Sequence, residues 1–335
     1  MTDLPPLRYL SGADVTAAMP SLAERLALAE TVLRGLAGNA ELPPKIGIHP
    51  RPAGSFGHAM PAYLPGADPS GAGDRIGMKW VLAVSQNNER HLPAINATLL
   101  LNDPLTGIPT AILDAGPITA ERTAATSGVA VRAWAPPTGG RAPRAALIGA
   151  GVQGRSHVPV IGHVLPGVRL AVYDRDSARA ASLAAFASRV DGIAAAAVAP
   201  DARAAVAGAD VVVSAAAFVP PPERQAMTTE WLTDDALVVP VDYATYCSAG
   251  VAKAARLFVV DHLGQFLANR EAGQFDGYPD PTAMFGESLD GTSGTGRPRG
   301  RVVATHLGTG LADVVFGSAI LAAAEAAGLG TLLPR

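Results

Sequence analysis

The chain has 335 residues, 49% of them hydrophobic, and a formal net charge of −3. This length allows two domains with cores of their own. The weak negative charge and the lack of a basic stripe exclude a typical nucleic-acid-binding protein. The apolar runs are shorter than the ~20 residues that cross a bilayer, and the first residues lack a secretory signal pattern. The single cysteine excludes an internal disulfide, and the histidine spacing indicates no metal site. We therefore expect a cytoplasmic protein without a metal, membrane or nucleic-acid partner.

The N-terminal part of the chain predicts one long helical segment followed by short strands. Apolar residues recur every three or four positions over residues 13–37, as in an amphipathic helix. Pro20 interrupts this pattern, so the main helix is expected to start after Ser21, which forms a capping box with Glu24. Alternating polar and apolar residues then predict strands at 45–49 and 57–64.

Lys79 stands inside a mostly apolar strand, residues 76–84, between Met78 and Trp80. Burying an ammonium group without a partner is costly, so its surroundings matter. One interpretation is an edge strand on which Lys79 faces solvent. The other is a pocket in which Lys79 pairs with a substrate carboxylate.

Two strands, 97–102 and 109–114, flank a hairpin turn at 103–107. A helix is expected to begin near Ile118, with Thr119 as its N-cap. Arg122 would then lie in the first turn, where the helix dipole disfavours a cation by a few tenths of a kcal/mol. This conflict suggests that Arg122 holds an anion, and a solvated surface arginine is the alternative.

After a linker at 136–140 the pattern changes to alternating strands and helices, which predicts a doubly wound parallel sheet. The expected strands are 145–148, 169–173, 194–198, 210–215, 236–241 and 256–260. A long glycine-rich loop at 273–300 follows, and a final helix at 314–327 is expected to pack on the first domain.

The first turn of this alternating region has the spacing G-x-G-x-x-G at Gly149, Gly151 and Gly154. Glycines at these positions allow a tight turn, a close approach to a pyrophosphate, and close packing of helix on strand. Asp174 follows 20 residues after Gly154, where a carboxylate binds the ribose hydroxyls of NAD. NAD is therefore the expected cofactor, although Arg175 beside it would suit NADP. The alternative for Asp174 is a helix N-cap.

Asp242 lies at the end of the fifth strand of the predicted sheet. Ligands of such sheets bind outside the carboxyl ends of the strands. Asp242 is therefore a candidate catalytic carboxylate, and the alternative is a carboxylate that caps the next segment.

These residues together resemble the ornithine cyclodeaminase/mu-crystallin family over most of the chain. The segments that carry the resemblance are 60–64, 77–79, 102–109, 118–125, 149–154 and 307–313. The resemblance implies an α/β fold with a Rossmann doubly wound parallel sheet and a discontinuous α+β domain for substrate binding and dimerisation. The Rossmann domain would cover 131–304, and the substrate and dimerisation domain would cover 1–130 together with 305–335.

The resemblance also implies roles for several side chains. Lys79 and Arg122 would bind the substrate carboxylate, with Lys79 and Asp242 as the catalytic residues. Lys45 and His58 would complete the substrate site, at positions where ornithine cyclodeaminases carry an arginine and a glutamate. The cofactor set would be Gly149, Gly151, Val152, Gln153, Gly154, Asp174, Arg175 and Thr123.

The function that follows is hydride transfer at the α-carbon of an amino or imino acid by an NAD(P)-dependent amino-acid dehydrogenase or imine (ketimine) reductase. An ornithine cyclodeaminase-type ammonia lyase with catalytic NAD is the alternative, but Lys45 and His58 depart from its pattern. A second alternative is a non-catalytic, nucleotide-binding protein like mu-crystallin. The expected partners are a small amino or imino acid and a second copy of the chain.

Overall fold

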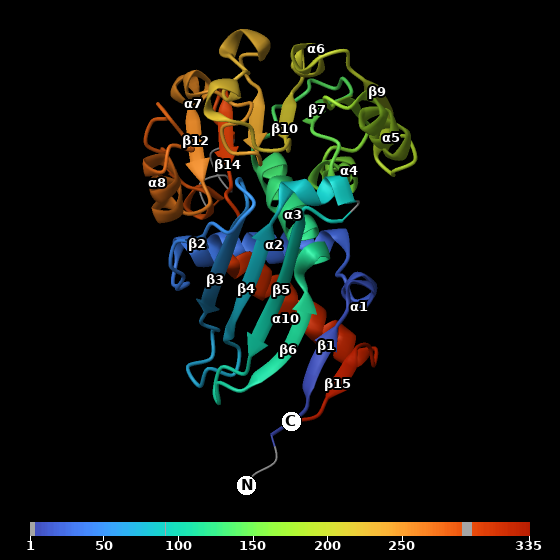
Figure 1. Ribbon diagram of the computed structural model, residues 1–335. Helices are drawn as coiled ribbons and strands as arrows, with labels where there is room; N and C mark the ends of the chain where they lie inside the picture. The colour runs from blue at the N-terminus through green and yellow to red at the C-terminus, as the bar shows by residue number, and fades with distance from the viewer. Residues whose placement is uncertain (1–3, 91, 290–296) are drawn as a thin grey trace. The chain divides into compact units, whose positions relative to one another are not determined.

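The computed structural model describes residues 4–90, 92–289 and 297–335. Contacts within the chain form two compact units (Figure 1). Unit 1 combines Met1–Arg122 with Gly308–Arg335, and unit 2 is Thr123–Leu307. The substrate-binding and dinucleotide-binding roles expected for the two domains stay predictions at this stage.

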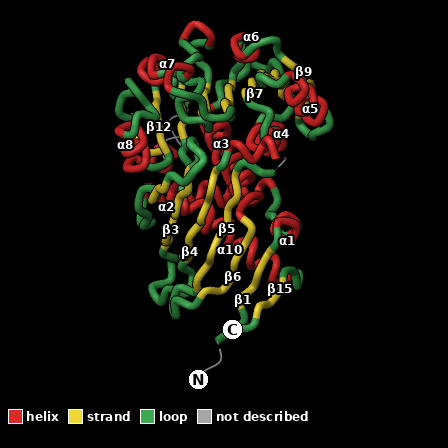
Figure 2. Tube along the Cα trace, viewed as in Figure 1, coloured by secondary structure: helices red, strands yellow, loops and turns green. Residues whose placement is uncertain are grey.

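Unit 1 is a seven-stranded sheet with helices on one face (Figure 2). The strand order is β15 (Thr331–Leu333), β1 (Leu7–Leu10), β6 (Pro109–Asp114), β5 (Ile95–Asn102), β4 (Arg75–Ala83), β3 (Phe56–Leu64) and β2 (Ile46–Ile48). The β1–β6 pair is parallel, and the other pairs are antiparallel. Helix α10 (Gly310–Ala326) packs on β3, β4, β5 and α2 (Leu22–Ala37), while α1 (Gly12–Ala17) contacts α10 and β6.

The predicted division of the N-terminal helical segment is confirmed. Helix α1 ends before Pro20, and α2 starts after Ser21. The Ser21 hydroxyl accepts from the Glu24 backbone N–H, and the Glu24 side chain accepts from the Ser21 backbone N–H, which completes the capping box. The strands predicted at 45–49, 57–64, 76–84, 97–102 and 109–114 are also present, with ends shifted by a few residues.

The predicted start of the next helix is wrong. Helix α3 (Ala115–Trp134) begins four residues before Thr119. Asp114 provides the reason, because its Oδ1 accepts the backbone N–H of Gly116 at 2.8 Å, as a capping side chain does. Arg122 therefore lies beyond the first turn, and the helix dipole gives no argument about its role.

The register of the unit 1 sheet places two kinds of side chain on opposite faces. Met60 of β3, Lys79 of β4 and Leu99 of β5 are cross-strand neighbours, and all three are buried. They lie on the face that α10 covers, since α10 contacts all three strands. Trp80, one position after Lys79, points to the opposite face and is 40% exposed.

Unit 2 contains an eight-stranded sheet in which every pair is parallel. The order is β13 (Ala283–Met284), β12 (Leu257–Val260), β14 (Val302–Thr305), β11 (Leu237–Pro240), β10 (Val211–Ser214), β7 (Arg144–Ile148), β8 (Val168–Tyr173) and β9 (Ile193–Val198). Its helices include the larger part of α3, from Thr123 onward, and α4 (Val152–Val164), α5 (Ser177–Ala187), α6 (Ala202–Val206), α7 (Ala249–Ala254) and α8 (Leu263–Glu271). Short 3-10 helices occur at η2 (Pro221–Glu223) and η3 (Thr229–Trp231), and at η1 (Ser85–Arg90) in unit 1.

All six predicted strands of this sheet are confirmed, but two strands were missed. Strand β14 inserts between β11 and β12, and β13 lies at the sheet edge. β13 falls inside the predicted loop at 273–300, of which residues 290–296 lie outside the described part. Among the helices that the structure describes, none is long and apolar enough to span a membrane.

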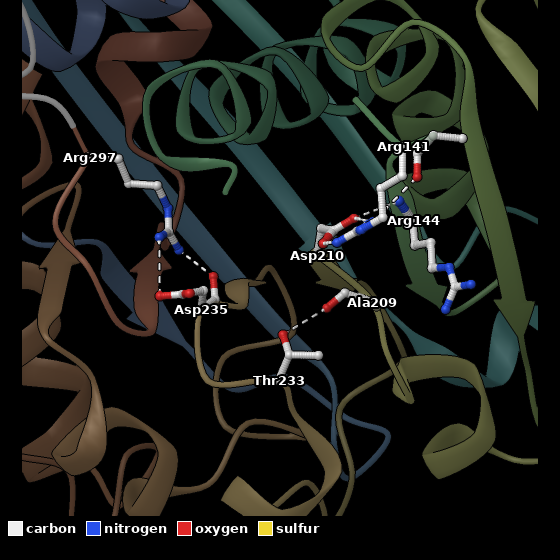
Figure 3. Close-up of polar contacts among 8 residues, drawn as sticks. Arg141, Arg144, Ala209, Asp210, Thr233, Asp235 and Arg297 are labelled. Carbon is white, nitrogen blue, oxygen red and sulfur yellow. Dashed lines mark hydrogen bonds and ion pairs between the residues drawn. The ribbon is translucent and has the colours of Figure 1, made fainter. Parts of the chain in front are cut away.

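Polar side chains fix the amino ends of the unit 2 strands (Figure 3). Asp210 precedes β10, and its carboxylate accepts the Arg144 backbone N–H at 2.8 Å and both terminal nitrogens of the Arg141 guanidinium. Arg297 donates to the backbone carbonyl of Asp235, which precedes β11. These contacts occupy the amino edge of the sheet, and the opposite, carboxyl edge carries the candidate site.

Candidate functional site

The glycine-rich turn between β7 and α4 has the shape that the sequence predicts. Gly149 has a φ of +101°, and a Cβ on it would lie 2.4 Å from the carbonyl oxygen of Ala215. A Cβ on Gly154 would lie 2.0 Å from the carbonyl oxygen of Gly149. Side chains at these two positions would therefore force the turn open. Gly151 is the N-cap of α4 and has no side chain to cap the helix, so the first N–H groups of α4 suit an anion.

A pocket of about 300 Å³ lies at this turn. Its lining includes Gly149, Gly151, Asp174 and Arg175, which the sequence predicts for the cofactor, and also Arg179 and Tyr246. Val152, Gln153, Gly154 and Thr123, which complete the predicted cofactor set, are not part of this lining. Val152 is 73% exposed, and Thr123 is buried.

Asp174, directly after β8, forms hydrogen bonds with the turn that follows β7 and with its own loop. Its Oδ2 accepts the Ala150 backbone N–H at 2.7 Å, and its Oδ1 accepts the Asp176 backbone N–H at 2.9 Å. The N-cap of α5 is Asp176, so the interpretation of Asp174 as that N-cap is wrong. Each carboxylate oxygen has a second lone pair for a ribose hydroxyl. Arg175 pairs only loosely with Glu223, at 3.8 Å.

Asp242 is a buried carboxylate at the carboxyl edge of the same sheet, directly after β11. Ser214 Oγ donates to its Oδ1 at 2.8 Å, and the Ala216 backbone N–H donates to its Oδ2 at 3.2 Å. Burial raises the pKa of Asp242 to about 7, although these hydrogen bonds and one from the Tyr246 backbone act to lower it. The next residue, Tyr243, has a φ of +57°, a conformation uncommon for a residue with a side chain. Asp242 is therefore held by hydrogen bonds, two of which come from the backbones of the pocket residues Ala216 and Tyr246.

Unit 1 contains a second polar site, a buried cluster formed by Lys79, Arg122 and Asp313. Lys79 Nζ lies 2.6 Å from Asp313 Oδ2, and Arg122 Nε donates to Asp313 Oδ1 at 3.2 Å. Lys79 Nζ also donates to Thr119 Oγ1 at 3.4 Å. Lys79 is 1% exposed and Arg122 is 6% exposed. The interpretation of Lys79 on an edge strand is wrong, because β4 lies between β3 and β5. The interpretation of Arg122 as a solvated surface residue is also wrong, because its side chain is buried.

The electrostatics of this cluster favour an additional anion. Burial lowers the pKa of Lys79 to about 8, while Asp313 raises it and Arg122 and Lys45 lower it further. Lys79 and Arg122 share the single carboxylate of Asp313, and the charge of Lys45 also acts on Lys79. A carboxylate ligand would add a second anion for these cations.

His58 lies near the same charges but differs from them in protonation. Burial, together with the charges of Lys45, His49 and Lys79, lowers the pKa of His58 to about 4. The ring is therefore neutral at pH 7 and offers one donor and one acceptor. His58 and Met60 lie on the same face of β3, and Met60 is the cross-strand neighbour of Lys79 on β4, so His58 and Lys79 lie on one face of the sheet.

Two glycines explain how the cluster fits before α10. Gly308 has a φ of +72°, and a Cβ on it would lie 2.4 Å from Nη1 of Arg122. A Cβ on Gly310 would lie 2.3 Å from the carbonyl oxygen of Met60. The segment Gly308-Thr-Gly310 thus gives space to the Arg122 guanidinium and brings Asp313, in the first turn of α10, to Lys79.

Sequence reasoning missed Asp313 and Ser214 as site residues. Asp313 belongs to the quoted segment 307–313, and it is an acid in the first turn of a hydrophobic helix. Acids are common in the first turn of a helix because of the helix dipole, so the sequence gives no separate sign of the contact with Lys79. Ser214 ends an apolar strand and gives no signal of its own until β10 and β11 are paired.

The comparisons with known proteins agree with this architecture. A model of the ornithine cyclodeaminase/mu-crystallin family matches residues 11–297. The nodulation efficiency protein NfeD of Rhizobium meliloti is 35% identical over 336 residues, which cover 98% of this chain and 98% of that protein.

Two solved structures share the fold over nearly the whole chain. The Δ1-pyrroline-2-carboxylate reductase of Thermococcus litoralis, in complex with NADH and L-proline, matches with a TM-score of 0.82 and 25% identity over 97% of this chain and 99% of that one. An archaeal alanine dehydrogenase dimer with bound NAD matches with a TM-score of 0.82 and 25% identity over 98% of both chains. The predicted α/β fold class is thereby confirmed.

Proposed function

Because the chain belongs to the ornithine cyclodeaminase/mu-crystallin family, we propose that it is an NAD(P)-dependent oxidoreductase acting at the α-carbon of an amino or imino acid. In the reductive direction, an imino acid takes up a hydride and a proton and becomes an amino acid, while NAD(P)H becomes NAD(P)⁺. The observation that carries the proposal is the buried Lys79–Arg122–Asp313 cluster, in which two cations share one carboxylate. Similar proteins whose structures contain NADH and L-proline or NAD support it.

Lys79 and Arg122 are the proposed ligands of the substrate carboxylate, with Lys45 contributing charge. Asp313 fixes both cations by charged contacts at 2.6 and 3.2 Å, so their geometry is set before a substrate arrives. A fixed carboxylate determines where the α-carbon lies. Neutral His58 would donate or accept one hydrogen bond to the substrate's nitrogen or side chain.

The residues at the glycine-rich turn fit a dinucleotide. The turn is tight because Gly149 and Gly154 have no Cβ, which would collide with backbone atoms there. The N-terminus of α4 suits a pyrophosphate. Asp174 would bind the ribose hydroxyls, which favours NAD, while Arg175 leaves NADP as the alternative. When bound, the cofactor supplies or accepts the hydride.

Asp242 is the proposed proton carrier. Because burial brings its pKa to about 7, the carboxyl group both gives and takes a proton near neutral pH. In the reductive direction it would donate a proton to the imine nitrogen. In the oxidative direction the carboxylate would hold the amine or accept its proton.

Cyclodeamination is the second candidate function, since the family includes it by name. It requires the protein to handle a second amino group on the substrate. A neutral imidazole at His58, with its pKa lowered to about 4, attracts an ammonium group less than a carboxylate would. This observation favours the reductase or dehydrogenase over ornithine cyclodeamination.

A homodimer is the proposed assembly, in the cytoplasm. Ile46, Ala59 and Trp80 are cross-strand neighbours on the sheet face opposite α10, and Ile46 and Trp80 are 58% and 40% exposed. An apolar sheet face of this kind suits a second copy of the chain. Trp80→Glu should give a monomer in sedimentation experiments at concentrations where the natural chain is a dimer; an unchanged dimer would place the interface elsewhere.

A stoichiometry experiment tests the reaction. The protein receives a small amount of NAD and an excess of one amino acid from a panel that includes proline, alanine, ornithine and lysine, and NADH and ammonia are measured together. NADH that accumulates until the NAD is consumed supports the dehydrogenase or reductase. Ammonia that far exceeds the NAD supplied, without NADH, would show cyclodeamination. With no amino acid active, NADH and cyclic imino acids are supplied, and failure there would leave a protein that only binds nucleotides.

A further inference from the structure

Three buried side chains of unit 2 form a continuous hydrogen-bonded chain that the proposed reaction does not use. Ser127 lies on α3, His157 lies on α4, and His306 follows β14. Ser127 Oγ lies 2.8 Å from His157 Nε2 and 2.8 Å from His306 Nε2. His157 Nδ1 lies 2.6 Å from the carbonyl oxygen of Gln153. Their exposures are 1%, 0% and 2%, so bulk water does not compete for these contacts.

The available protons allow one order along this chain. The Gln153 carbonyl only accepts, so His157 Nδ1 must carry a proton. Burial lowers the pKa of His157 to about 4, so the ring is neutral at pH 7 and its Nε2 is an acceptor. The Ser127 hydroxyl therefore donates to His157 Nε2. Its single proton is then used, and His306 Nε2–H must donate to Ser127 Oγ.

One end of the chain is the dinucleotide turn. Gln153 lies in the fingerprint Gly149–Gly154 and in the first turn of α4, whose N–H groups suit a pyrophosphate. If Ser127 lost its hydroxyl, His157 Nε2 and His306 Nε2 would lose their shared hydrogen-bond partner. The imidazole that donates to the Gln153 carbonyl would then be held at one end only.

The other end of the chain is a turn at the carboxyl edge of the same sheet. Leu307, next to His306, donates its backbone N–H to Asp261 Oδ2 at 3.0 Å and accepts from Tyr243 Oη at 3.2 Å. Ser127 thus connects two backbone segments at the edge where ligands of such sheets bind.

We propose that Ser127, His157 and His306 form a positioning chain that holds the first turn of α4 for the dinucleotide pyrophosphate. The three residues do not touch the cofactor in this proposal, and they act through the Gln153 carbonyl. The inference rests on the dinucleotide-binding part of the proposed function.

Direct binding experiments test the chain without measuring turnover. NADH and ADP-ribose contain the pyrophosphate, and adenosine does not. The loss of one net hydrogen bond corresponds to about a fivefold change, so Ser127→Ala should weaken NADH and ADP-ribose binding by at least about that factor. Adenosine binding should remain unchanged, since adenine and ribose do not contact α4's first turn in this proposal.

Ser156→Ala is the matched control. The Ser156 hydroxyl also donates to the Gln153 carbonyl, at 3.0 Å, and it is also buried. Ser156 makes no hydrogen bond to the side chains of Ser127, His157 or His306 in this proposal, so the loss of its hydroxyl should leave NADH binding within about twofold of the natural chain. Equal weakening by both variants would show that any hydroxyl near this carbonyl matters, which would overturn the proposal.

A second pair of variants keeps the test informative if Ser127→Ala does not fold. His306→Gln retains an N–H donor for Ser127, and His306→Met removes it. We expect NADH binding close to normal in the first and weakened in the second. In the natural chain, nitrogen-15 spectra of labelled histidine should show protonated Nδ1 for His157 and protonated Nε2 for His306, and the opposite pattern would refute the proton order.

The outcomes separate the two proposals. If the natural chain binds neither NADH nor ADP-ribose, the proposed function is wrong, and this inference falls with it. If the natural chain binds both and Ser127→Ala binds them equally well, the proposed function stands and the positioning chain is refuted.

Discussion

Replacing Asp242 by asparagine should make the stability of the chain less dependent on pH. In the natural chain the carboxyl group ionises in the unfolded state near its ordinary pKa of 3.8, and in the folded state only near pH 7, because burial disfavours the charge. Between these values the folded state holds a proton that the unfolded state has lost. Stability therefore falls as pH rises through this range and levels off above pH 7. Asparagine has no such proton.

The size of this effect follows from the difference between the two pKa values. Each pH unit corresponds to ~1.4 kcal/mol, so between about pH 5.5 and about pH 7 the natural chain loses roughly 2 kcal/mol through this group. The variant carries a constant penalty instead. Its amide oxygen accepts from Ser214 while its NH₂ group faces the Ala216 N–H, and an unsatisfied buried donor costs about 1–3 kcal/mol. The variant should thus be less stable at about pH 5.5 and should gain roughly 2 kcal/mol on the natural chain by about pH 8.5.

Urea unfolding at the two pH values measures this change. Tryptophan fluorescence suits the experiment, because unit 2 contains Trp134 and Trp231. Asp210→Asn is the matched control. Burial raises the pKa of Asp210, but the hydrogen bonds from Arg141 and Arg144 outweigh it and the net pKa is lowered. Asp210 is then ionised in both states throughout this range, and its variant should show a pH-independent loss. If the difference in unfolding free energy between the natural chain and Asp242→Asn stays constant with pH, the raised pKa of Asp242 and its role as proton carrier are refuted.

Three further variants test the two sites separately. Lys79→Met should lower kcat/KM by about 100-fold or more, because an anion-binding cation is lost beside a buried charge, while NADH titration shows unchanged affinity; normal turnover would remove Lys79 from the site. Gly308→Ala places a Cβ 2.4 Å from Arg122 Nη1 at a φ of +72°, so calorimetry should show a loss of about 1–3 kcal/mol, and an unchanged melting curve would contradict the contact. Gly149→Ala, with a Cβ 2.4 Å from the Ala215 carbonyl, should abolish NADH binding by isothermal calorimetry without loss of fold, and retained affinity would argue against this turn as the pyrophosphate site.

The sequence was sufficient for features that depend on local chemistry. The turn at Gly149, Gly151 and Gly154 was predicted from the spacing of its glycines, and the structure shows at Gly149 and Gly154 the close contacts that leave no space for a Cβ. The Ser21 capping box was predicted for a similar reason, since all its hydrogen bonds lie within four residues. The six strands of unit 2 were found because each is a short apolar run between helices.

Features that depend on distant pairing were not available from the sequence. Val302–Thr305 is as long as the predicted strands β10, β11 and β12, but it follows the glycine-rich loop at 273–300, so the alternation of strands and helices does not mark it until its pairing with β11 and β12 is known. A strand at the edge of the sheet and a strand in its centre can show the same sequence pattern around Lys79, so the sequence could not decide between these two positions. Asp313 shows the same limit, because it is 234 residues from Lys79 in the chain and its position at a helix start already has a local explanation.

Burial shifts the pKa values of Lys79 and Asp242, but the two residues differ in their charge at pH 7. Lys79 is fully buried, which lowers its pKa to about 8, yet Asp313 at 2.6 Å supports its charge. Lys79 therefore remains mainly cationic at pH 7, as a carboxylate ligand requires. The hydrogen-bond donors of Asp242 are the neutral groups of Ser214 and Ala216, which offset burial less than a cation would. Its pKa accordingly rises to about 7, where a group transfers protons most readily at neutral pH. The difference in partners thus supports anion binding by Lys79 and proton transfer by Asp242.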